Sequence, residues 1–171
     1  PTMLDQDILL FPIHHQMPLH WSLCAVYPHS GHIHYFDSLG GLGAGVMANI
    51  AQLMTDLRGR YAPAAPPVAW TTWPAGRSSP QQLNGVDCGI FLLLSADLLA
   101  ETLPLLFTQR DIPAMRIKIG VSILGGCIWY CPELWCVDEQ RRLSRWTVPT
   151  LPSRSPNPLT SSPQATPGLT S

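Results

Sequence analysis

The chain has 171 residues, of which 46% are hydrophobic and only 12% are charged, so it can bury one core. Its formal net charge of −1 provides no basic face, and we expect no nucleic-acid partner. The longest apolar run, residues 90–106, is interrupted by Asp97, Glu101 and Pro104, so we expect no membrane partner. The start does not have the pattern of a secretory signal. Five cysteines are an odd number without small-scaffold spacing, which favours a reducing compartment.

Three segments near the start have strand patterns. Residues 8–13 and 21–27 are mostly apolar, and residues 32–36 alternate between polar and apolar side chains. Pro28 to Gly31 supply a turn between the last two segments. The pattern predicts three strands, the second and third joined as a hairpin.

Helical patterns follow further along the chain. Apolar residues recur at helical spacing over residues 45–58, a proline-rich linker over residues 61–80 contains a short predicted strand at 68–72, and residues 90–99 read as a buried helix. A last helix is predicted near residues 114–124. Because strands and helices are partly segregated, the fold class is expected to be α+β.

Cys88 stands where the loop ends and the buried helix begins. The unpaired N–H groups and the dipole of a first helical turn favour a thiolate, which is the form of cysteine that attacks carbonyl groups. Alone, a cysteine is more often a small buried hydrophobe. Its polar surroundings favour a catalytic thiol here, whereas Cys24, inside an apolar strand, is predicted to be core.

A thiolate needs a base and a group that orients the base. His20 lies just before one predicted strand and Asp37 just after its hairpin neighbour, so both are expected at the same end of the sheet. An Asp-to-imidazole hydrogen bond would fix which ring nitrogen faces the thiol. The alternative for Asp37 is a plain turn residue.

The loop before Cys88 offers further groups. Gln82 precedes Cys88 by six positions, and its amide can donate to an oxyanion without adding charge. Asn84-Gly85 is a strong turn signal. Asp87 is expected to be the N-cap of the helix.

Four blocks carry a family resemblance: HWSL at 20–23, YFDSLGG at 35–41, PQQLNGVDCGIF at 80–91 and FTQRDIPAMRIKI at 107–119. In this order they resemble the ubiquitin-like-protein proteases, the sentrin or SUMO-specific cysteine proteases. The resemblance covers roughly residues 5–125. It implies a papain-like α+β fold, a small mixed sheet flanked by helices, and no metal or organic cofactor.

The resemblance also implies roles for single residues. His20 would be the general base, Asp37 its orienter, Cys88 the nucleophile and Gln82 an oxyanion-hole donor. Trp21 would cover the Gly-Gly tail of the substrate, although a strand aromatic is as often core. The implied activity is cleavage after the Gly-Gly terminus of SUMO, in precursor maturation or removal from target lysines.

The implied partner is SUMO or another ubiquitin-like protein with its conjugates, and we expect a monomer in the nucleus or cytoplasm. A protease for another modifier, such as a Nedd8-like protein or ubiquitin, remains open, as does a protease of viral or mobile-element origin. Because family members carry a helical region upstream of the first strand, the catalytic domain at residues 1–125 is expected to be truncated at its N-terminus. An inactive SUMO-binding module is therefore a further alternative.

Other residues have plainer interpretations. The pairs His14 and His15, and His32 and His34, lack further ligands at zinc spacing, so surface or turn histidines are expected. Residues 126–171 are expected to be a largely disordered extension rich in Pro, Ser and Thr. Its cysteines at 127, 131 and 136 make a zinc site a minor alternative.

Overall fold

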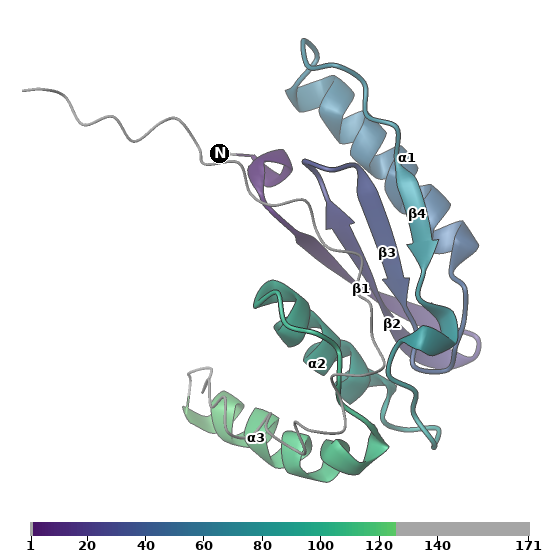
Figure 1. The fold of residues 1–171 in the computed structure, drawn as a ribbon, viewed down its shortest axis with the longest axis vertical. Coiled ribbons are helices and arrows are strands. Elements are labelled where there is room, and N and C mark those ends of the chain that lie inside the picture. Colours follow the sequence, from purple (N-terminus) through teal and green to yellow (C-terminus); the bar gives the residue numbers. More distant parts are fainter. Residues whose placement is uncertain (1, 126–171) are drawn as a thin grey trace, which may run out of the picture. The chain divides into compact units, whose positions relative to one another are not determined.

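The computed structural model describes residues 2–125. A four-stranded mixed sheet lies at its centre, in the order β1-β2-β3-β4 (Figure 1). Neighbours are antiparallel from β1 to β3, and β4 runs parallel to β3. The strands are β1 (Leu9–Gln16), β2 (Leu19–Tyr27), β3 (His32–Phe36) and β4 (Thr71–Pro74). The predicted small mixed sheet is thereby confirmed.

Strands β1 and β2 form a longer hairpin than the sequence predicted. Cross-strand pairing continues to His15 opposite His20 and Gln16 opposite Leu19. His20 is therefore the second residue of β2, and the expectation that it precedes the strand was wrong. Ladder hydrogen bonds of β1 extend the strand past the apolar segment from which the prediction was made.

The last strand is shifted along the chain from its predicted position at residues 68–72. Its parallel register pairs His32 with Thr71 and Tyr35 with Pro74. Because β3 begins only at His32, Val68 to Trp70 have no residues of β3 opposite them. The partner strand, rather than local composition, sets where β4 begins.

In residues 2–125 the α-helices are α1 (Ala44–Tyr61), α2 (Cys88–Ala100) and α3 (Ile112–Gly125). Helices α1 and α2 flank the sheet, and α3 packs on α2. Each lies within a few residues of its predicted position. Short 3-10 turns are present at Met3–Asp5, Gly76–Ser78 and Gln109–Asp111.

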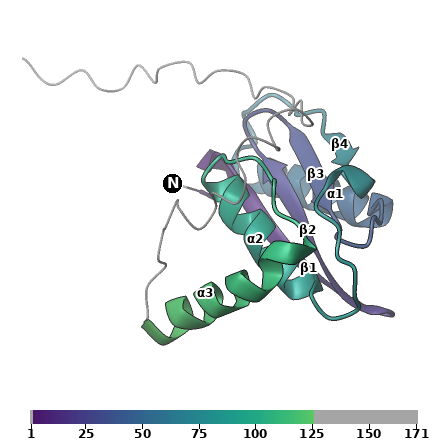
Figure 2. The same ribbon diagram turned by 60° about the horizontal axis from the view of Figure 1, so that its bottom comes forward.

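The alternation of side chains along β2 places α1 and α2 on opposite faces of the sheet (Figures 1 and 2). Cys24 and Val26 pack in a cluster with Met54 of α1. Leu23 and Ala25 pack instead with Leu92 of α2. Since nearly all of α2 is apolar, it can contact the sheet on one side and α3 on the other.

Helix α3 and the loop before it pack on α2 through a third cluster, in which Phe91 contacts Phe107, with ring centroids 5.3 Å apart. Within residues 2–125, none of the helices has the length and apolar content needed to cross a bilayer. The expected extension at 126–171, with its three cysteines, lies outside the described residues.

Candidate active site

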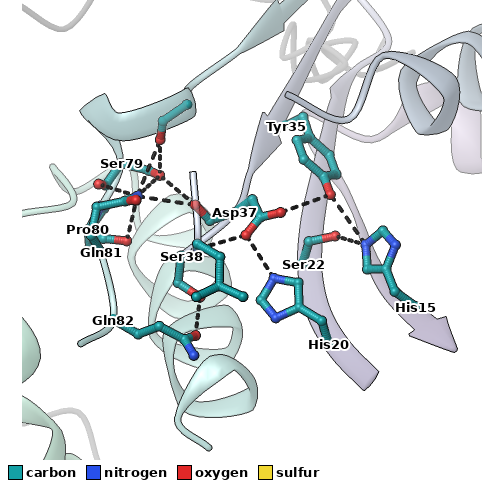
Figure 3. Close-up of polar contacts among 12 residues, drawn as sticks. His15, His20, Ser22, Tyr35, Asp37, Ser38, Ser79, Pro80, Gln81 and Gln82 are labelled. Carbon is teal, nitrogen blue, oxygen red and sulfur yellow. Dashed lines mark hydrogen bonds and ion pairs between the residues drawn. The ribbon is translucent and has the colours of Figure 1, made fainter. Parts of the chain in front are cut away.

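The expected partnership of His20 and Asp37 is present. Nε2 of His20 lies 2.7 Å from Oδ1 of Asp37, and both residues are buried, with 6% and 7% of their surfaces exposed. His20 is on β2 and Asp37 directly follows β3, so the hairpin brings the two together (Figure 3). When Nε2 carries the hydrogen given to Asp37, Nδ1 is left as the basic nitrogen of the ring.

The Asp37 carboxylate is held by two further donors. The backbone N–H of Leu39 donates to Oδ1 at 2.8 Å, and the hydroxyl of Tyr35 donates to Oδ2 at 3.4 Å. Burial raises the pKa of Tyr35, which keeps this hydroxyl protonated and able to donate. These two bonds hold the carboxylate in position independently of its bond to the His20 imidazole.

Gln82 is attached to the same corner of the fold. The Ser38 hydroxyl donates to the Gln82 side-chain carbonyl at 2.6 Å (Figure 3). The Gln82 amide donates to the carbonyl oxygen of Asn84 at 2.5 Å. Gln82 is buried. Because a primary amide has two N–H donors, one remains for another acceptor.

Cys88 is the first residue of α2 and is partly exposed. Asp87 occupies the N-cap position, as predicted, but its side chain makes no capping hydrogen bond. Its carboxylate instead accepts from Asn84 at 2.6 Å and Gln109 at 2.7 Å, and pairs with Arg116 of α3. These bonds, that from Arg116 foremost, lower the pKa of Asp87 to about 2.

The interactions of Asp87 fix the backbone just before the thiol, because Asp87 directly precedes Cys88 and its side chain is bound to Arg116 of α3. Within residues 2–125, no hydrogen bond joins the Cys88 thiol to the His20 ring. Catalytic hydrogen bonds are often long without substrate and shorten in the complex. The structure therefore unites His20 and Asp37, links Gln82 to them through Ser38, and places Cys88 at the start of the helix that packs on β2.

Trp21 is not part of the core. It is 41% exposed, and its ring lies 4.6 Å from that of His14 on the neighbouring strand. Its exposed position beside His20 leaves it accessible to a bound polypeptide.

Residues 1–125 match the family model described as the Ulp1 protease family, C-terminal catalytic domain. The chain belongs to the Ulp1 protease family. The match spans the four candidate catalytic residues His20, Asp37, Gln82 and Cys88, whose roles remain proposals.

Curated members of the Ulp1 family include sentrin-specific protease 2 of Rattus norvegicus, which is 32% identical over 125 residues. That alignment covers 72% of this chain but 21% of the relative. Sentrin-specific protease 5 of Mus musculus is 35% identical, with 68% of this chain and 15% of the relative covered. The chain thus spans between 15% and 21% of the length of these relatives.

Two solved structures have the same fold. A Ulp1-like SUMO protease catalytic domain of Chaetomium thermophilum matches with a TM-score of 0.60 and 25% identity, over 75% of this chain and 49% of that one. The C-terminal Ulp1 protease domain, solved in complex with Smt3, the yeast ortholog of SUMO, matches with a TM-score of 0.57 and 25% identity, over 70% and 52%. The expected protease fold is confirmed.

Several residues around the site were not singled out from the sequence. Ser38 directly follows Asp37 and donates to Gln82. Tyr35 lies two positions before Asp37 and donates to its carboxylate. Their place in the YFDSLGG block was the available signal. Gln109 and Arg116, which hold Asp87, are more than 20 positions away from it, and no local pattern connects them.

His14 is exposed, as expected, but His15 and His34 differ from the expectation of surface or turn residues. His15 is half-buried within β1 and lies 2.8 Å from the Ser22 hydroxyl. His34 is half-buried between Tyr27 and Trp73, at 5.1 Å from each ring, and burial lowers its pKa to about 4. Alternation along a strand turns such side chains inward.

Two further expectations concern cysteine and metal. Cys24 is fully buried, as predicted, and burial raises the pKa of its thiol to about 12. In the described part of the chain, no three His, Cys, Asp or Glu side chains are grouped as metal ligands.

Proposed function

We propose that the chain is a cysteine protease domain that cleaves after the Gly-Gly terminus of SUMO, in precursor maturation, in removal of SUMO from target lysines, or in both. The observation that carries this proposal is the buried 2.7 Å bond between His20 and Asp37, in a Ulp1-family chain with a cysteine at the start of α2.

The chemistry follows from the roles of the three side chains. Nδ1 of His20 takes the proton of the Cys88 thiol, and the sulfur attacks the carbonyl carbon of the terminal glycine. His20 then gives that proton to the leaving amine, and a thioester remains. Water, activated by the same ring, hydrolyses the thioester. Asp37 keeps the ring in the required tautomer and stabilises the imidazolium.

Gln82 has the role of an oxyanion donor. Its amide is held by Ser38 and Asn84, so little reorganisation is needed when negative charge develops on the carbonyl oxygen. The backbone N–H groups of Cys88 and Gly89 can add to this stabilisation, because the first N–H groups of a helix have no intrahelical partners.

SUMO is favoured as the modifier because the matched relatives are named sentrin-specific proteases and a related domain was solved with Smt3. Trp21, exposed beside His20, would cover the Gly-Gly tail. We also propose a nuclear or cytoplasmic location, no cofactor, and SUMO conjugates as partners of a monomer.

A panel of modifiers tests the specificity. The purified chain is incubated with fluorogenic C-terminal amides of SUMO, a Nedd8-like protein and ubiquitin, alongside Cys88→Ala. Release from SUMO alone, lost in Cys88→Ala, is the expected result. Preferential release from another modifier would support the proposed cysteine-protease chemistry but show that SUMO is not the substrate. Release that persists in Cys88→Ala would overturn the proposal.

One observation favours a second candidate, an inactive SUMO-binding module. The chain aligns with only 49% of the solved Chaetomium thermophilum catalytic domain, so about half of that domain has no counterpart in the alignment. Calorimetric binding of SUMO without turnover by a folded chain would favour this candidate over the protease.

A further inference from the structure

His15 is close to the proposed base but has no role in the chemistry above. It lies directly opposite His20 in the β1–β2 ladder. The two rings are stacked, with centroids 5.8 Å apart and an angle of 25° between their planes. Two imidazoles therefore lie side by side at the end of the hairpin (Figure 3).

Hydrogen bonds connect His15 to the other side of the Asp37 carboxylate. Nε2 of His15 lies 2.8 Å from the Ser22 hydroxyl and 3.3 Å from the Tyr35 hydroxyl. The Tyr35 hydroxyl in turn lies 3.4 Å from Oδ2 of Asp37. Asp37 thus has His20 at Oδ1 and, through Tyr35, His15 at Oδ2.

The Tyr35 hydroxyl has one hydrogen, which it can give to His15 or to Asp37. When Nε2 of His15 carries a hydrogen, that nitrogen cannot accept, and the hydroxyl donates to Asp37. When Nε2 carries none, it competes with the carboxylate for the same hydrogen. A hydrogen on Nε2 of His15, which the protonated ring always has and the neutral ring has in only one tautomer, therefore secures the bond that orients Asp37.

Charge adds a second effect. A proton on His15 places a positive ring beside His20, where a second positive ring would be repelled. The titratable groups that face His15 are His20 from β2, Tyr35 from β3, and Asp37 beyond Tyr35. Of these, the Asp37 carboxylate attracts a positive charge on His15, whereas a positive charge on His20 repels it.

We propose that His15 is a positioning residue for the His20–Asp37 pair: it directs the Tyr35 hydroxyl and couples its own protonation to that of His20. The proposal rests on the role proposed above for His20 and Asp37. The protonation of His20 then depends on the protonation of His15 on the neighbouring strand β1, and not on the thiol alone.

The test is a proton NMR titration of the His20 ring in the full chain, with Cys88→Ala removing the thiol. We expect a His20 curve that is broader than that of a single site. In His15→Gln, which keeps a polar side chain without the charge, the curve should become that of a single site. Its acid end should move to higher pH, because the neighbouring positive ring that repels a proton on His20 has been removed.

His29→Gln is the matched control, because His29 is an exposed turn residue; it should leave the His20 curve unchanged. A His20 curve that is the same in His15→Gln as in the parent would overturn the proposal. If His15→Gln does not fold, His15→Asn provides the same comparison.

The titration is independent of turnover, so the two proposals fail separately. Loss of SUMO cleavage with a coupled His20 curve would remove the protease function and leave the coupling in place. Cleavage with an uncoupled curve would do the reverse.

Discussion

The hydroxyl of Ser38 donates a 2.6 Å hydrogen bond to the side-chain carbonyl of Gln82, 44 positions further along the chain. Both residues are buried. The bond joins the residue after Asp37 to the loop that leads into α2, so the proposed oxyanion donor and the orienting carboxylate are fixed relative to each other.

Ser38→Ala should therefore affect both stability and activity. It leaves the buried Gln82 carbonyl without its donor, which costs about 1–3 kcal/mol of the free energy of unfolding. Urea denaturation measures this loss, and SUMO hydrolysis should fall further than the change in folded fraction explains. Ser30→Ala is the control, since Ser30 is exposed and makes only a 3.5 Å bond in its own turn; equal effects of the two variants would contradict the role of Ser38.

Gly41→Ala should disturb the proposed orienter directly. A Cβ at Gly41 would come closer to Oδ2 of Asp37 than real Cβ atoms do, so the carboxylate or the loop must move. A misplacement of about 1 Å can reduce a rate about 100-fold. Gly45→Ala is the matched control, because a Cβ there meets nothing within 4 Å. Rates of SUMO hydrolysis that are the same in both variants would count against the expected displacement.

The pairing of Asp87 with Arg116 predicts a pH-dependent stability. The pKa of Asp87 is lowered from 3.8 to about 2 by Arg116 first, then by Asn84 and Gln109. Because the folded-state pKa is below the unfolded one, the stabilisation is fully present above about pH 4 and is lost as the pH falls toward 2.

Arg116→Ala should reduce the contribution of the ionised Asp87 carboxylate to the free energy of unfolding. The unfolding free energy should drop at neutral pH, and the difference from the parent should narrow below pH 4. Arg110→Ala, which changes an exposed arginine on the same segment, is the control. Denaturant curves between pH 2 and 7 measure the effect, and a difference that stayed constant over that range would contradict it.

Cys24 and Cys88 should differ in alkylation. Burial raises the pKa of the Cys24 thiol to about 12, so almost none is thiolate at pH 8, and the side chain is inaccessible. Cys88 is partly exposed at a helix start. Brief treatment with iodoacetamide and peptide mapping should find Cys88 modified and Cys24 protected until urea is added. Equal labelling of the two in buffer would contradict the burial of Cys24 or the exposure of Cys88.

Local sequence patterns were sufficient for much of the fold. The alternation in residues 32–36 and the turn at Pro28 to Gly31 predicted the hairpin, and this hairpin brings His20 to Asp37. The limits of β2 and β4 were wrong because a strand ends where its partner ends, and the partner is not visible in a local window.

The site shows the same division between local and long-range information. Cys88 at the start of α2 followed from the switch between turn residues and an apolar run. The hydrogen-bond partners of the Asp87 carboxylate could not be predicted from the local sequence. The local pattern predicted a capping bond, whereas Gln109 and Arg116, brought near by the packing of the chain, donate to the carboxylate instead. His15 was placed at the surface because nothing in its neighbours along the chain indicated Ser22 or Tyr35.

We propose that Cys88, His20 and Asp37 form a working protease site for SUMO. The most direct measurement exposes the purified chain to SUMO carrying a C-terminal electrophile, beside Cys88→Ala and matching ubiquitin and Nedd8-like probes, with the adduct located by mass spectrometry. We expect a covalent adduct with SUMO alone, on Cys88, that is absent from Cys88→Ala. A folded chain that forms no adduct, or forms one on another cysteine, would contradict it.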